Sequence, residues 1–273
     1  MNRLLLFVRF RAISVLEHVA HCLYPRNSVQ AAERDARRNM LREHGRFFAL
    51  LERTYNLVVR FDVQFHDREL KSLTAREQAA LLLFGRIANA LRRIQEDAHN
   101  AYGPDACGQA ASLFEFCWAA AYLCGDEQAA KKWLARERLS EGMDVRTAIK
   151  RYLARHSISN QQTDLEYEVY RRLNAFKHAS PTWLSFHHPQ DWSKGGTLRI
   201  GPDLSPHGQW ALCFSLEASS QLVLMALAEA ASQLLSDSVR KQFMRDVDAA
   251  NQVRLTLHAA IQERWGATEM DQQ

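Results

Sequence analysis

The sequence predicts an all-α fold, a helical bundle, and three observations lead to that prediction. Apolar residues recur at helical spacing in most segments, capping residues stand at the start of several of them, and Gly or Pro separates them. The chain has 273 residues, 47% of them hydrophobic and 24% charged, which is enough for a well-buried core. One interruption near 181–214 predicts a small β-hairpin or extended loop inserted before the last two helices.

The N-terminal helical region is predicted to cover residues 1–70. Leu4 to Leu23 alternates apolar and basic residues as an amphipathic helix does, and such a helix packs on a domain or lies at a membrane surface. Packing on a domain is the commoner use. Tyr24 to Ser28 breaks this helix, and Val29 to about Val59 then predicts a second one, rich in Arg, Glu and Ala.

A helical core is predicted over 71–273, although both regions together also fit one continuous domain. Thr74 to Glu77 has the pattern of a capping box, and the helix behind it continues to Gly103. Asp105 is predicted to cap the next helix, which is so continuously apolar up to Gly125 that it should be central and buried.

Shorter helices are predicted next. Asp126 and Asp144 are expected to cap helices over Glu127 to Arg138 and Val145 to Arg155. Ser159 has the spacing of a second capping box, and it opens a helix that ends near residue 178.

Gly and Pro crowd the stretch after this helix. The short apolar runs Thr197 to Ile200 and Trp210 to Phe214 lie between them, which favours a hairpin or an extended loop. Helical spacing returns over Leu216 to Leu235 and over Ser238 to Trp265.

Charge, cysteine content and hydropathy indicate the kind of partner and the compartment that the chain suits. The net charge of +4 is spread along the chain, so a nucleic-acid partner is permitted but not indicated. The five cysteines are odd in number, and Cys117 and Cys124 lie in an apolar helical stretch, as reduced core thiols do. No apolar run approaches the roughly 20 residues that span a bilayer. We therefore expect a cytoplasmic protein without a transmembrane segment.

The common catalytic sequence motifs are absent or incomplete in this chain. Residues 103–110 have Walker-like glycine spacing but lack the Lys and the Ser or Thr that hold phosphate and magnesium. The chain contains no His-Glu-x-x-His, no Cys-x-x-Cys and no Gly-x-Ser-x-Gly. A metal could gather His187, His188, His207 and Cys213 if the loop folds back, but loop histidines are more often solvated. Neither a metal nor a cofactor is therefore expected.

A single segment, Tyr167 to His178, suggests a chemistry. At about 100° per residue it predicts an apolar stripe, formed by Leu165, Val169, Leu173 and Phe176. The opposite face gathers polar groups, namely Tyr167, Arg171, Asn174 and His178. Arg172 points close to the stripe, so it needs a carboxylate such as Glu115 or must extend outward to solvent. An arginine that holds a phosphate beside a histidine that moves a proton suits metal-independent cleavage of a phosphodiester.

At these residues the chain resembles the HEPN superfamily, helical domains with an Arg-x4-6-His motif at the end of a helix. It is more closely similar to a bacterial helical group whose motif is Tyr-Arg-x-Leu-Asn-x-x-x-His, here Tyr170 to His178. The resemblance covers about 109–181. Many HEPN proteins look like endoribonucleases of toxin–antitoxin and antiviral-defence systems. The resemblance thus implies a homodimer that acts on RNA, with an antitoxin or a defence-system protein as a further partner.

The resemblance also implies roles for individual residues. His178 would be the general acid or base, Arg171 or Arg172 would clamp the phosphate, and Asn174 would orient the ribose or the histidine. The expected substrate contacts are Lys177, Tyr167 and Tyr170.

This sequence departs from the HEPN pattern at one place. HEPN nucleases usually carry a polar residue directly after the motif arginine. Here Arg171 is followed by the polar Arg172, but Arg172 is followed by the apolar Leu173. Either Arg171 is the active arginine, or the motif has drifted and the domain only binds. In that alternative the protein is a non-catalytic helical module for protein or RNA, and Lys177 and His178 merely complement the helix dipole.

Overall fold

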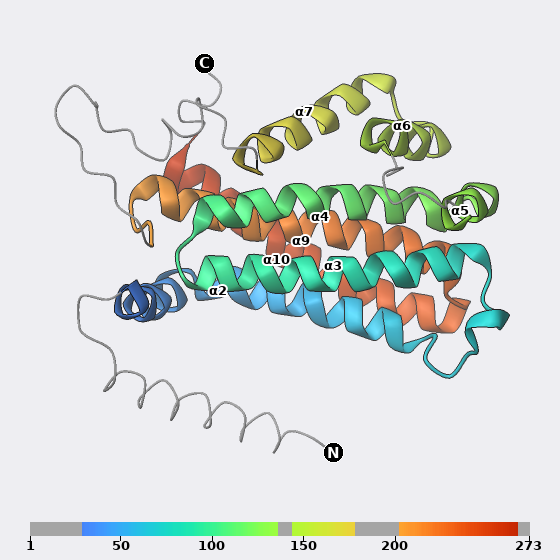
Figure 1. The fold of residues 1–273 in the computed structure, drawn as a ribbon, viewed down its shortest axis with the longest axis horizontal. Coiled ribbons are helices and arrows are strands. Elements are labelled where there is room, and N and C mark those ends of the chain that lie inside the picture. The colour runs from blue at the N-terminus through green and yellow to red at the C-terminus, as the bar shows by residue number, and fades with distance from the viewer. Residues whose placement is uncertain (1–28, 136–143, 178–201, 267–273) are drawn as a thin grey trace.

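The computed structural model describes residues 29–135, 144–177 and 202–266 (Figure 1). These ranges form helices and contain no strand, which confirms the all-α prediction for them. In chain order the helices are α2 (Val29–Val63), the short 3-10 helix η1 (Leu70–Ser72), α3 (Ala75–His99), α4 (Gly103–Cys124), α5 (Glu127–Leu134), α6 (Val145–Arg155), α7 (Asn160–Lys177), α9 (Pro206–Leu234) and α10 (Asp237–Trp265).

Five long helices, α2, α3, α4, α9 and α10, make a bundle, and the shorter α5, α6 and α7 pack against α4 (Figure 1). Helix α9 contacts α2, α3, α4 and α10, whereas α4 contacts α3, α9 and all three short helices. The two helices therefore hold the centre of the molecule. Residues from 36 to 65 belong to the same buried apolar cluster as residues from 73 to 261.

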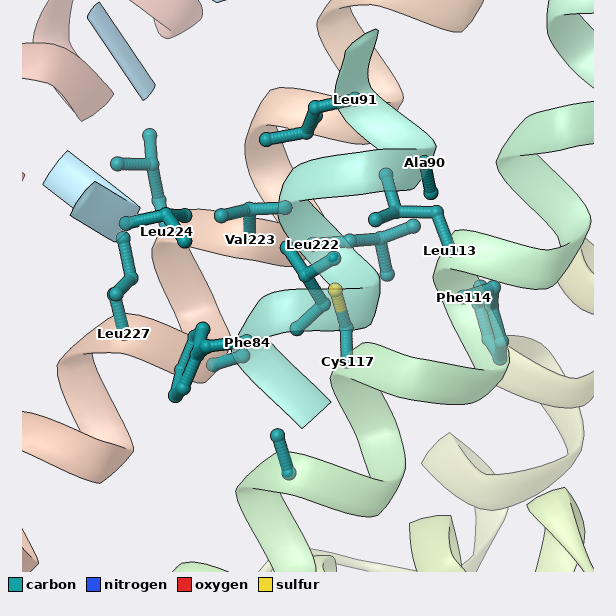
Figure 2. Packing of buried hydrophobic residues seen from close by; sticks show 14 of the residues in the cluster. Phe84, Ala90, Leu91, Leu113, Phe114, Cys117, Leu222, Val223, Leu224 and Leu227 are labelled. Carbon is teal, nitrogen blue, oxygen red and sulfur yellow. The ribbon is translucent and has the colours of Figure 1, made fainter. Parts of the chain in front are cut away.

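Side chains of α3, α4 and α9 meet in the core. Leu91 of α3, Leu113 of α4 and Val223 of α9 point toward one another, while Phe114 points to the other side of α4 (Figure 2). All four are buried. Helix α4 thus presents apolar groups on more than one face, as its continuously apolar sequence predicts.

Helix α9 is long and apolar enough to cross a membrane by length and composition, and it is the one such helix in the described ranges. In the structure, 78% of its most apolar window is buried inside the bundle. Its composition is accounted for by this central position.

Buried charges are paired and join the helices. Glu229 of α9 meets Arg155 Nη1 at 3.1 Å and His156 Nε2 at 3.1 Å. Arg155 Nη2 also donates to the carbonyl of Tyr122, at 2.7 Å, near the end of α4. These contacts fix the end of α6, and hence the start of α7, against α4 and α9.

Several predicted helix starts are confirmed. Thr74 and Glu77 form the reciprocal capping box of α3, and Asp126 and Asp144 accept hydrogen bonds from the backbones of Ala129 and Thr147. Helix α6 has the predicted bounds, Val145 to Arg155.

The prediction that Asp105 caps α4 is wrong. The helix begins at Gly103, and Tyr102 at the N-cap makes no side-chain capping bond. Pro104 fits the first turn because a proline there needs no hydrogen-bond partner for a backbone N–H. The chain reaches this start through a sharp turn at Ala101, whose φ is 61°.

The expected extended run Trp210 to Phe214 is also a wrong prediction, because these residues are helical. Ser205 Oγ accepts from the backbone N–H of Gly208 at 3.1 Å, and Pro206 occupies the first turn, so α9 starts before the predicted Leu216. The remainder of the expected hairpin or loop, including Thr197 to Ile200, lies outside the described residues.

The bundle depends on a close approach between α4 and α9. A Cβ built on Gly103 would overlap the backbone oxygen of Gly208 and would lie 2.8 Å from the backbone nitrogen of Leu212. Backbone atoms cannot move aside as the end of a side chain can, so only glycine fits at this position.

We therefore predict that Gly103→Ala lowers the free energy of unfolding by about 1–3 kcal/mol, as overpacking does. The matched control is Gly85→Ala in α3, where an added Cβ meets nothing within 4 Å. This control should raise stability by about 0.5–1 kcal/mol, since alanine has the better helix propensity. Urea unfolding followed by circular dichroism measures both, and equal stability of the two variants would contradict the close approach.

Candidate functional site

The candidate site is the C-terminal half of α7, which packs on α4 and α6. At the start of the helix, Ser159 Oγ accepts from the backbone N–H of Gln161 at 3.2 Å. Near its end, Tyr170 Oη donates to Glu115 Oε1 at 2.8 Å, and the Tyr170 ring lies 5.4 Å from that of Phe114. Leu173 is fully buried beside them. These contacts set the rotation of α7 about its own axis.

Only the second half of the predicted apolar stripe, Leu173 and the partly buried Phe176, packs on the bundle. Leu165 is 62% exposed and Val169 is 40% exposed, whereas Leu173 is 1% exposed. The buried face also includes Thr163, with Tyr167 and Tyr170 partly buried against the core. Tyrosine rings bury a large area, and Tyr170 also supplies a hydroxyl that bonds to Glu115. The tyrosines are therefore packed on the bundle in preference to Leu165 and Val169.

Both motif arginines bind the same carboxylate. Arg171 Nη1 lies 3.0 Å from Glu168 Oε2, and Arg172 Nε lies 3.5 Å from Glu168 Oε1. All three side chains are exposed to solvent. Since exposed ion pairs contribute little stability, this arrangement holds the guanidinium groups loosely.

Glu115, expected as a partner of Arg172, is used by other groups. It accepts from Tyr170 and lies 3.7 Å from Lys177 Nζ. Burial and this hydrogen bond raise the pKa of the Tyr170 phenol, which therefore stays protonated and acts as a donor. Tyr170 thus has a structural role, because it attaches α7 to α4.

Asn174 carries an unusual polar atom. Its Oδ1 is buried and accepts no hydrogen bond from any residue that the structure describes. Such groups are rare in folded proteins and deserve an explanation. Among the predicted site residues that the structure describes, only Asn174 has a buried polar atom without a hydrogen-bond partner.

His178 lies outside the described residues. The structure therefore brings Arg171 and Arg172 together around Glu168, and Tyr170 and Lys177 around Glu115. It describes the phosphate clamp of the predicted site but not its acid or base. In the described ranges no group of three or more His, Cys, Asp or Glu side chains is placed to hold a metal ion.

Two strongly perturbed groups near the α3–α4 corner were missed by sequence reasoning. Burial, and then the nearby Arg37, lowers the pKa of His99 to about 4, and its ring stacks on Phe48 at 4.4 Å. Burial, and then the charges of Asp105 and Glu96, raises the pKa of Asp97 to about 6. The one sequence signal is that both residues flank the buried Ala98 in the last turn of α3.

Comparison of the chain with protein-family models, with curated proteins and with solved structures gives no match. The functional assignment therefore depends on the residues of α7 themselves.

Proposed function

We propose that the protein is a metal-independent endoribonuclease of the HEPN type and that the end of α7 contacts RNA. The observation that supports this is the arrangement of Arg171 and Arg172, two exposed guanidinium groups that share one exposed carboxylate. Two cations against one anion leave a net positive charge at this end of the helix. A phosphate can replace Glu168 as the partner of either arginine, because the existing ion pairs are weak.

The proposed reaction follows from these groups. The ribose 2′-oxygen attacks the adjacent phosphorus as the P–O5′ bond breaks, which gives a 2′,3′-cyclic phosphate and a free 5′-hydroxyl. The negative charge that develops on the non-bridging oxygens is stabilised by Arg171. His178 transfers a proton to or from the reacting oxygens. A homodimer would bring a second copy of the motif to the same RNA, so that one histidine acts as the base and the other as the acid.

We predict that Arg171→Ala and His178→Ala each slow cleavage of RNA by at least about 100-fold in the presence of EDTA. Gel analysis of a mixed structured and single-stranded RNA substrate measures this effect. The matched control is Arg151→Ala, which removes an exposed arginine of the neighbouring α6 and should change the rate less than twofold.

Arg171→Ala should also change the free energy of unfolding by no more than about 0.5 kcal/mol, because only an exposed ion pair is lost. Cleavage that is equally fast in the wild type and in His178→Ala would refute the ribonuclease proposal.

The second candidate is a non-catalytic helical module, and the exposure of Leu165 and Val169 favours it. These side chains lie one turn apart on the side of α7 that does not face α4. Tyr167 and Tyr170, predicted to contact a substrate, are instead packed against the core. A second copy of the chain that packs on Leu165 and Val169 would bury this apolar surface.

For this candidate we predict that Leu165→Asp converts a dimer into a monomer, because the charge would be buried in the contact. Leu82→Asp is the control, since Leu82 is 58% exposed on α3, far in sequence from α7. Sedimentation velocity over a range of concentrations measures both. A dimer that persists in Leu165→Asp would exclude this face as the contact.

A further inference from the structure

A second feature of the molecule is a pocket where helix α2 bends. At His44 the backbone leaves helical geometry, with φ −120° and ψ 17°. The bend faces the last turns of α10, and a pocket of about 520 Å³ opens between them. This volume suits a small organic molecule.

His44 is a polar group built into the wall of this pocket. Its side chain is only 2% exposed, and its Nδ1 lies 3.3 Å from Cys213 Sγ. Burial raises the pKa of the Cys213 thiol to about 12, so at neutral pH the thiol is protonated. Burial, and then the nearby Arg264, lowers the pKa of His44, so the imidazole is neutral.

The second ring nitrogen of His44 is Nε2. This Nε2 is buried. A hydrogen bond with the side chain of Gln209 raises the pKa of His44, and Gln209 Oε1 also accepts from Arg264 Nη2, at 3.2 Å. His44 thus forms part of the pocket wall without presenting a free donor to it.

The rim of the pocket is basic. It carries Arg42, Arg46 and Arg264 against a single acid, Glu43. Arg42 Nη2 meets Glu43 at 3.5 Å, and Arg46 has no ion-pair partner among the described residues. Three guanidinium groups and one carboxylate leave a net charge of +2, which complements a phosphate dianion. Guanidinium groups also match the geometry of phosphate oxygens.

The remaining wall is apolar. It includes Phe47 and Leu257, both buried, and the partly buried Trp265, over whose ring the Arg264 guanidinium lies at 4.7 Å. The pocket therefore has a cationic side for an anion and an aromatic side for a carbon skeleton.

We propose that this pocket binds an organic phosphate monoester, with its phosphate on Arg42, Arg46 and Arg264 and its organic part against Phe47, Leu257 and Trp265. The site comes from α2 and α10 and uses none of the motif residues of α7. It therefore adds a small-molecule site that is independent of the proposed action on RNA.

The test is isothermal titration calorimetry of the full chain with phenyl phosphate and with inorganic phosphate at constant ionic strength. Phenyl phosphate should bind with one-to-one stoichiometry and at least about tenfold more tightly than inorganic phosphate, because its ring is removed from water. Equal affinities would overturn the assignment of the apolar wall, and the absence of binding by phenyl phosphate would overturn the site.

Two variants locate the binding. Arg46→Gln should weaken the affinity for phenyl phosphate by about tenfold or more, as expected for loss of a charge-assisted hydrogen bond. The control is Arg38→Gln, an exposed arginine of the same helix that pairs with Asp35 at 3.0 Å and does not line the pocket. This control should change the affinity less than twofold, and an equal loss in both variants would overturn the proposal in favour of general charge attraction.

Gly45→Leu tests the pocket without removing a charge. A Cβ on Gly45 meets nothing within 4 Å, so the larger side chain enters open space at the lining of the pocket. Binding of phenyl phosphate should be lost while the thermal midpoint of unfolding stays the same or rises. Undiminished binding by a folded Gly45→Leu protein would place the ligand elsewhere.

Discussion

The burial of α4 on nearly every side is the constraint on which the rest of the structure depends. Along one side it approaches α9 so closely that Gly103 cannot carry a side chain, and on its other sides it contacts α3, α5, α6 and α7. Small residues dominate its buried positions, among them Ala106, Ala110 and Ala120. Such residues allow neighbouring backbones to come close, so a large part of the core is shared between this helix and its partners.

Helix α4 also determines what α7 presents to solvent. Phe114 and Glu115 are adjacent on α4, and the first supplies a ring contact and the second a hydrogen bond to Tyr170. Once Tyr170 and Leu173 are held against α4, Arg171 and Arg172 must point outward. The exposed arginines of the proposed RNA-binding surface are thus a consequence of packing on the opposite side of the same helix.

Much of the fold can be predicted from the sequence because helix starts are decided locally. The capping box at Thr74 and the caps at Asp126 and Asp144 involve residues only three positions apart. The start of α9 was predictable in principle from Ser205 and Pro206. Glycines and prolines around Trp210 favoured an extended run instead, and its apolar residues do not distinguish a short strand from a buried helix.

The candidate site was harder to predict because rotation of a helix depends on tertiary contacts. The apolar stripe predicts that Leu165 and Val169 are buried together with Leu173 and Phe176. The contacts of Tyr170 with α4 instead bury Leu173 and leave Leu165 and Val169 exposed. The pocket at His44 had no local signal, since its walls come from segments more than 200 residues apart in sequence. The His44 imidazole is buried by tertiary contacts with Cys213 of α9 and Trp265 of α10, which its local sequence does not indicate.

Native-state hydrogen exchange tests the central role of α4 most directly. Amides of α4 and α9 should exchange only through global unfolding, because both helices are enclosed by the bundle, whereas amides of α7 should exchange through a local opening of lower free energy. Denaturant dependence distinguishes the two routes, since global unfolding exposes more surface. Exchange of α4 by local opening at the same free energy as α7 would contradict this account.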